Sequence, residues 1–140
     1  MPDPSEQEIK DFVVEHSNLW MAHDKQRHTE LWKRFASNEI IFEDPVGSPP
    51  KLGWDQWSEM WDRFNEFTLD YHAERIYACG NEAAIAFYHK MNTGDEITEI
   101  RDIEIWKFDN GTVEVRCWWD YPDAGAHAAT LKEYSTLGGH

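Results

Sequence analysis

Residues 42–53 read FEDPVGSPPKLG, and this stretch separates a strand-like segment from a helix-like one. The run before it, EIIFE at residues 39–43, is typical of a short strand. Two adjacent prolines and a glycine fit neither a strand ladder nor a helix interior, so the strand must end here. Asp44 therefore lies at a strand end, immediately before a rigid turn.

Two interpretations of Asp44 are open at this point. A carboxylate at a strand end is aimed by the scaffold, and partial burial against Phe42 raises its pKa toward the range of a general base. Alternatively, Asp44 begins a proline-containing turn and bonds to its own backbone. Composition alone favours the turn.

Helical periodicity surrounds this stretch on both sides. Apolar residues at helical spacing predict helices over about residues 5–22, 25–36 and from Gly53 to Phe64. The first of these helices begins with a capping box formed by Ser5 and Glu8. The apolar positions that indicate the helices are Ile9, Phe12, Val13, Leu19, Trp20, Leu31, Trp32, Phe35, Trp57, Met60, Trp61 and Phe64.

The remaining chain favours strands. Segments 69–79, 83–91, 96–108 and 113–121 are joined by Gly- and Asn-containing turns. Helices followed by antiparallel strands predict an α+β domain, and a sheet that curls around helices leaves a concave face for a pocket. We expect one domain over residues 1–140, with its core at about 5–122 and a tail at 123–140.

Charge and composition exclude several function classes. The net charge of −14 disfavours nucleic acids and anionic membranes, which need clustered Lys and Arg. The chain has no run of apolar residues long enough to span a membrane, and its first residues do not resemble a secretory signal. We therefore expect a cytoplasmic protein, with Cys79 and Cys117 as buried free thiols rather than a disulfide.

Alternation along residues 98–108 places a second carboxyl beside aromatic rings. One face of this strand carries Ile100, Asp102, Glu104, Trp106 and Phe108. If this face lines the cavity, Glu104 stays protonated and can donate a hydrogen bond to an oxyanion. Alternatively, Glu104 pairs with Arg101, Arg116 or another cation. The pattern does not choose between these two.

Other candidate residues have structural alternatives. Asp120 shares a face with Arg116 and Trp118, and is either a pocket base or the ion-pair partner of Arg116. His16, on the apolar stripe of the first helix, has the position of a core histidine. His72 and His89 lie on strands, where a pocket position is the less favoured reading.

Three residues near the start of the second helix are expected to have structural or surface positions. Asp24 should cap this helix, and His23 and His28 should lie on the surface. The spacing of His and Cys shows no metal-binding motif, so we expect neither metal nor cofactor.

Three segments resemble one known family. FEDPVGSPPKLG is similar to the strand-turn segment of bacterial ketosteroid isomerases, NEAAIAF at residues 81–87 to their third strand, and WKFDNG at residues 106–111 to a later strand-turn-strand. The similarity covers about residues 8–121. It implies the SnoaL-like, nuclear transport factor 2-like superfamily: a cone-shaped, strongly curved, mostly antiparallel sheet packed on three N-terminal helices, enclosing a pocket and often dimeric.

The resemblance also implies roles for individual residues. Asp44 falls on the general base and Glu104 on the neutral acid of an enzyme that shifts a proton through a dienolate. His16 falls on the position of the oxyanion-binding Tyr, with Trp20 as the other candidate. Asp120 falls on an aromatic pocket-lining position. The implied function is isomerisation of a steroid-like or other hydrophobic cyclic ketone, in a homodimer that binds a small hydrophobic substrate.

Alternatives of the same fold remain open. A dehydratase, polyketide cyclase or epoxide hydrolase-like enzyme would use Asp120 or an Asp–His pair, such as Asp24 with His72 or His89. A non-catalytic ligand-binding or dimerisation domain is a further possibility. The expected residues of the substrate pocket are Trp20, Phe42, Val46, Trp61, Phe87, Trp106 and Trp118.

Overall fold

The computed structural model describes residues 3–92, 94 and 96–120 of the chain, and the predicted tail lies outside this range. In chain order the elements are α1 (Glu6–Met21), α2 (Lys25–Phe35), β1 (Glu39–Glu43), β2 (Lys51–Leu52), α3 (Gly53–Phe64), the 3-10 helix η1 (Asn65–Phe67), β3 (Thr68–Cys79), β4 (Glu82–Asn92), β5 (Ile97–Asp109) and β6 (Thr112–Asp120). The α+β prediction is confirmed, with each predicted element within a few residues of its observed bounds.

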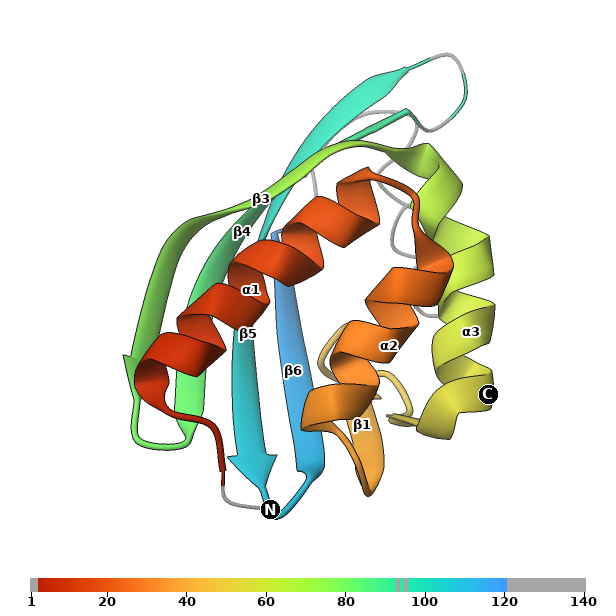
Figure 1. Cartoon of the computed structure of the whole chain (residues 1–140). Coiled ribbons are helices and arrows are strands. Elements are labelled where there is room, and N and C mark those ends of the chain that lie inside the picture. Colours follow the sequence, from red (N-terminus) through yellow and green to blue (C-terminus); the bar gives the residue numbers. More distant parts are fainter. Residues whose placement is uncertain (1–2, 93, 95, 121–140) are drawn as a thin grey trace.

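The strands form one open, curved sheet with the order β2-β1-β6-β5-β4-β3. Figure 1 shows the three helices on one side of this sheet. All neighbouring strands are antiparallel except β1 and β6, which run parallel, with Phe42 opposite Val115. This pairing brings the end of β1, and hence Asp44, beside the last described strand.

Local sequence signals account for the start of two helices. The Ser5 hydroxyl accepts a hydrogen bond from the Glu8 backbone N–H, and the Glu8 carboxylate accepts one from the Ser5 N–H. The predicted capping box is therefore present. Asp24 caps α2 by accepting from the Arg27 N–H at 3.1 Å, which confirms its predicted structural role.

The core is dominated by aromatic rings between the helices and the sheet. Phe12 of α1 packs against Trp32 of α2 with ring centroids 4.7 Å apart, and against Trp106 of β5 at 5.3 Å. Both tryptophans are at most 2% exposed. Trp32 also lines the cavity described below, so this aromatic core forms part of the cavity wall.

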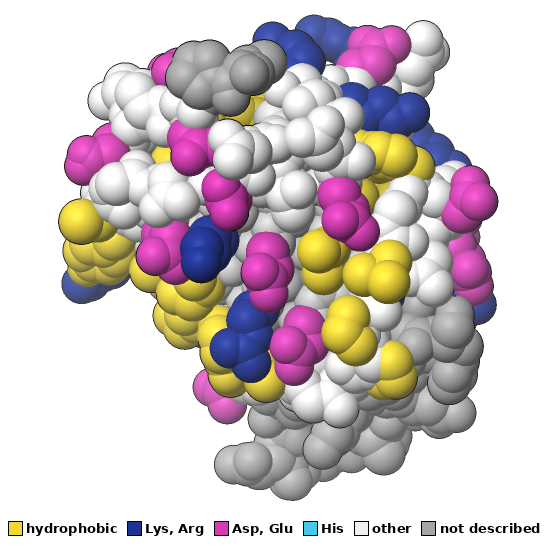
Figure 2. Space-filling model, turned by 90° about the horizontal axis from the view of Figure 1, so that it is seen from below, with side chains coloured by type: hydrophobic (Ala, Val, Ile, Leu, Met, Phe, Trp, Pro, Cys, Tyr) yellow, Lys and Arg dark blue, Asp and Glu magenta, His cyan; other side chains and the backbone are white. Residues whose placement is uncertain are grey.

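The surface carries the acidic excess of the sequence. On the face seen from below in Figure 2, acidic side chains are spread among apolar and basic ones. None of the helices among the described residues is long and apolar enough to cross a membrane. Cys79 and Cys117 are free, as predicted, but Cys79 is exposed rather than buried.

Candidate active site

A cavity of about 130 Å³ lies between the helices and the concave face of the sheet. Its walls are mostly apolar and aromatic, with a few polar groups from different elements. The lining residues are His16, Trp20, His28, Trp32, Ile40, Phe42, Asp44, Lys51, Trp57, Met60, Phe64, Phe67, Thr68, Tyr71, His89, Met91, Glu104, Val115, Cys117 and Trp119. An apolar cavity with convergent polar groups is the usual form of a small-ligand site.

Asp44 lines this cavity from the end of β1. Its carboxylate accepts a hydrogen bond of 2.5 Å from Nε1 of Trp119, and its carbonyl oxygen accepts one from the Lys51 amine. Burial raises the pKa of the Asp44 carboxyl, while the nearby Lys51 charge and the Trp119 hydrogen bond partly oppose this rise. Asp44 is therefore a pocket carboxylate held in a fixed orientation.

Glu104 also lines the cavity, and Asp102 lies beside it on the buried face of β5. Trp106 Nε1 donates a 2.9 Å hydrogen bond to Glu104 Oε1. Burial raises the pKa of Asp102 to about 8, although a hydrogen bond with Glu104 partly opposes this rise. Burial also raises the pKa of Glu104 well above its ordinary value, and the neighbouring Asp102 adds to this. Both acids are thus kept protonated at neutral pH.

The alternative ion pairs of Glu104 are absent from the described residues. Arg101 pairs with Glu74 at 2.9 Å, and Arg116 pairs with Glu43 at 3.1 Å. Both arginines lie on the outer face of the sheet, because strand alternation sends them away from Glu104. The predicted alternation of β5 is confirmed, and the ion-pair reading of Glu104 is wrong.

His89 of β4 completes a buried group with the two acids. Its Nε2 lies 3.6 Å from Oδ2 of Asp102, and ligand atoms of His89, Asp102 and Glu104 lie within 4.8 Å of one another. Burial lowers the pKa of His89 to about 4, so the ring is neutral. These three residues could hold a divalent cation, which would require both acids to be ionised.

Two further histidines and a tyrosine form a hydrogen-bonded chain along another wall. His16 Nε2 lies 2.9 Å from the Tyr71 hydroxyl, and His16 Nδ1 lies 2.7 Å from His28 Nε2. Burial lowers the pKa of His28 to about 3 and that of His16 well below its ordinary value. The surface reading of His28 is wrong, since this side chain is fully buried between α2 and α3.

Some predicted site residues lie elsewhere. Asp120 is exposed, and Trp118, 40% exposed, lies on the same outer face of β6, so the pocket position of Trp118 is wrong. The neighbouring Trp119 lines the cavity instead. Val46 lies in the loop after β1, with its N–H bonded to the Cys117 carbonyl, and does not line the cavity.

Three predicted pocket aromatics form the layer behind the wall rather than the wall itself. Trp61, Phe87 and Trp106 are buried but contact lining residues: Trp61 donates to His28, Phe87 stacks on Tyr71, and Trp106 donates to Glu104. Trp20 and Phe42 line the cavity as predicted. His72 is exposed and bonded to Asp70, His89 lies beside Asp102, and Asp24 caps α2, so neither histidine pairs with Asp24 in the described part of the chain.

Comparison with known proteins identifies the fold. No protein-family model and no curated protein sequence matches the chain. Among solved structures, one similar protein is SalBIII, an epoxide hydrolase/cyclase-like enzyme of pyran ring formation in the polyether salinomycin. The two structures have a TM-score of 0.71 at 18% sequence identity. The match covers 83% of this chain and 93% of SalBIII. The chain has the fold of SalBIII and of a SnoaL-like polyketide cyclase.

Two other structures agree with this assignment. A protein designated a SnoaL-like polyketide cyclase from Jannaschia Sp. CCS1 has a TM-score of 0.68 at 11% identity, covering 98% of this chain and 97% of that protein. A de novo designed protein with a curved β-sheet has a TM-score of 0.69 at 15% identity, covering 94% and 97%. Identities this low establish a shared fold, and the chemistry must be argued from the cavity.

Sequence reasoning missed several residues of this cavity. Tyr71, Lys51 and Trp119 line it, yet none was singled out. Alternation along β6 could have identified Trp119, since it shares a face with Val115 and Cys117. A bulge between Ala73 and Arg75 shifts the register of β3, so no simple alternation marks Tyr71.

Proposed function

We propose that this protein is an acid–base enzyme that isomerises a small cyclic ketone through an enolate. The observation that supports this most is that one apolar cavity is lined by two unlike carboxyl groups. Asp44 is oriented by Trp119 next to the Lys51 charge, whereas Glu104 is buried beside a second acid and kept neutral. Carboxyls whose environments differ in this way suit the roles of base and acid.

In the proposed reaction Asp44 acts in its ionised form and Glu104 in its neutral form. The Asp44 carboxylate removes a proton from the carbon between a ketone and a double bond, and the electron pair moves into an enolate. The neutral Glu104 carboxyl donates a hydrogen bond to the enolate oxygen as negative charge develops there. Asp44 then returns the same proton to the far carbon of the former double bond. The product is a conjugated enone, and Asp44 is again ionised.

The cavity volume favours a substrate with about one ring. An apolar cavity of roughly 150 Å³ holds a benzene molecule, and the cavity here has about 130 Å³. A substrate with four fused rings would have to leave most of its surface outside the cavity. Of the hydrophobic cyclic ketones implied by the family resemblance, small ones therefore fit better than steroids.

The test is an isomerisation assay with cyclohex-3-en-1-one, followed by the absorbance of the conjugated product. We expect the protein to accelerate conversion above the buffer rate, with a steroid Δ5-3-ketone converted more slowly. A chelator should leave the rate unchanged, because the proposed step uses no metal. Conversion of neither ketone above the buffer rate would contradict the proposal.

Epoxide opening is a second candidate function. The observation that favours it is the additional acid Asp102 beside His89, which the isomerisation does not use. Its fold neighbour SalBIII is an epoxide hydrolase/cyclase-like enzyme. In this reaction a neutral acid would protonate the epoxide oxygen while Asp44 deprotonates the attacking water. Conversion of cyclohexene oxide to its diol, with no conversion of cyclohexenone, would favour this second candidate.

A further inference from the structure

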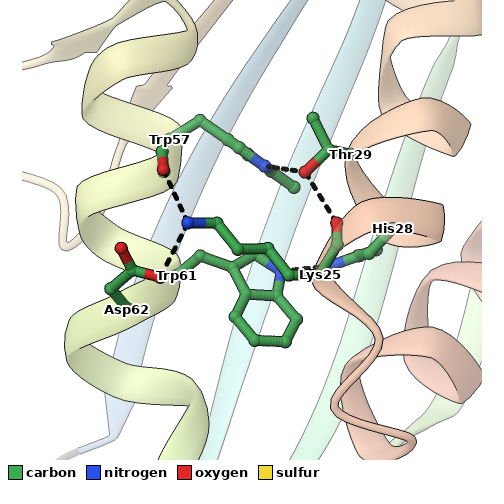
Figure 3. Close-up of polar contacts among 7 residues, drawn as sticks. Lys25, His28, Thr29, Trp57, Trp61 and Asp62 are labelled. Atoms are coloured by element: carbon green, nitrogen blue, oxygen red, sulfur yellow. Dashed lines mark hydrogen bonds and ion pairs between the residues drawn. The ribbon is translucent and has the colours of Figure 1, made fainter.

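A chain of hydrogen bonds connects the buried interface of α2 and α3 with the cavity. It runs from Trp61 through His28 and His16 to Tyr71. Figure 3 shows its first link, where Trp61 of α3 points toward His28 of α2. The tautomers of the two rings follow from which atoms can donate.

Trp61 sets the tautomer of His28. An indole N–H is always a donor, and Trp61 Nε1 lies 2.7 Å from Nδ1 of His28. His28 Nδ1 must therefore be an acceptor without a hydrogen. Because the buried ring is neutral, it has one hydrogen, which must lie on Nε2.

The same reasoning continues through His16. His28 Nε2–H points at His16 Nδ1, 2.7 Å away, so that nitrogen is an acceptor. Trp32 Nε1 donates to the same His16 nitrogen at 3.0 Å, and lies farther, at 3.2 Å, from His28 Nε2. His16 is also neutral, so its hydrogen lies on Nε2 and points at the Tyr71 oxygen, 2.9 Å away.

Tyr71 is the last residue in this series of hydrogen bonds. Its oxygen accepts from His16, and among the described residues His16 is the one hydrogen-bond partner of this oxygen. Its hydroxyl hydrogen must then point elsewhere, and Tyr71 lines the cavity. The ring is fixed by stacking on Phe87, with centroids 4.7 Å apart. Burial raises the Tyr71 pKa well above its ordinary value, so the phenol keeps its hydrogen.

We infer that Tyr71 is a catalytic residue whose hydroxyl donates a hydrogen bond to the ligand oxygen in the cavity. Trp61, His28 and His16 are positioning residues that fix the direction of this donation. The inference deepens the proposed function, since it adds a second donor beside Glu104 for the enolate oxygen. It also gives His16 a role different from the one implied by the family resemblance, because His16 acts through Tyr71 rather than on the substrate.

The direction of the chain can be tested without any substrate. Long-range proton–nitrogen NMR of 15N-labelled protein reports which ring nitrogen carries hydrogen in each histidine. We expect both His16 and His28 to carry it on Nε2. A hydrogen on Nδ1 of either ring would overturn the inference, whatever reaction the protein catalyses.

Two tryptophan variants test whether Trp61 fixes the tautomer of His28. Trp61→Phe removes the indole N–H that faces His28, and we expect the hydrogen of that ring to be distributed over both nitrogens. Trp57→Phe is the control, since Trp57 lies one turn earlier on α3 and donates to the Thr29 hydroxyl at 3.1 Å (Figure 3). An unchanged His28 spectrum in folded Trp61→Phe would overturn the role given to Trp61.

The role of Tyr71 is tested by replacing its hydroxyl. Tyr71→Phe should lower kcat by about 10²- to 10³-fold, the usual effect of removing one oxyanion donor. It should also move the carbonyl 13C signal of bound cyclohex-2-en-1-one toward that of the free ketone. Tyr77→Phe, a change at an exposed phenol, should affect neither. Equal carbonyl shifts in wild type and Tyr71→Phe would overturn the inference. If the ketone does not bind at all, the proposed function fails. The histidine tautomers still decide in which direction the hydrogen bonds from Trp61 to Tyr71 are donated.

Discussion

Replacing Asp44 with Asn is expected to lower kcat for cyclohex-3-en-1-one by about 10²- to 10⁴-fold, the usual contribution of a positioned general base. The amide keeps the shape of the side chain, and its oxygen can still accept the Trp119 hydrogen bond. It has no carboxylate to accept the substrate proton. The loss should therefore fall on kcat, with little change in KM.

The exposed Asp120 provides the control for this experiment. Asp120→Asn makes the same chemical change on the outer face of β6, outside the cavity. We expect it to leave the rate unchanged. Wild-type activity in Asp44→Asn, or a loss confined to Asp120→Asn, would show that Asp44 is not the base.

Replacing Asp102 with Asn should stabilise the fold at neutral pH. The pKa of Asp102 is raised from 3.8 to about 8 in the folded state, because its side chain is buried. Between these two values the unfolded chain has released the Asp102 proton while the folded chain retains it, so the contribution of Asp102 to stability falls as pH rises. The resulting destabilisation is about 2 kcal/mol at pH 5 and about 4 kcal/mol at pH 7.

An asparagine does not ionise, so the advantage of Asp102→Asn over wild type should grow with pH. Urea unfolding at pH 5 and pH 7 should show this advantage increasing by about 2 to 3 kcal/mol. Comparing the two proteins at each pH removes the titration of the buried histidines, which both share. Asp120→Asn should show no such trend. An advantage that is independent of pH would mean that Asp102 is ionised in the folded protein.

The elements of this fold follow from local sequence signals. Capping by Ser5 and Asp24, the break at Pro49 and Pro50, and strand alternation around Glu104 all act within a few residues. These signals predicted the order of helices and strands. They also placed Asp44 at a strand end and Glu104 on a buried face.

The rest of the site depends on contacts between distant segments. His28 lies in the polar run KQRHTE and becomes buried because α3 packs over it through Trp57 and Trp61. Tyr71 and His16 meet across 55 positions of the chain. Helix packing and the register of β3 determine these contacts. Periodicity within one element carries no information about them.

Trp118 and Trp119 show how a one-residue error in a strand changes the predicted face of a side chain. Neighbouring strand residues point to opposite faces, so an error of one position moves a side chain from the cavity to solvent. The inner face of β6 carries Val113, Val115 and Cys117, which makes Trp119 the inward tryptophan. Trp118 instead lies under the Arg116 guanidinium on the outer face, 4.9 Å from it.

Asp44 and Glu104 should have opposite protonation states in one cavity at neutral pH. Carbon-13 NMR of labelled Asp and Glu carboxyls, titrated in the free protein, measures this without any substrate. Asp44→Asn and Glu104→Gln assign the two signals. At pH 7 we expect the Asp44 signal to be that of a carboxylate and the Glu104 signal to be that of a protonated acid. A Glu104 carboxyl that ionises in the ordinary range of glutamate, well below neutral pH, would contradict it.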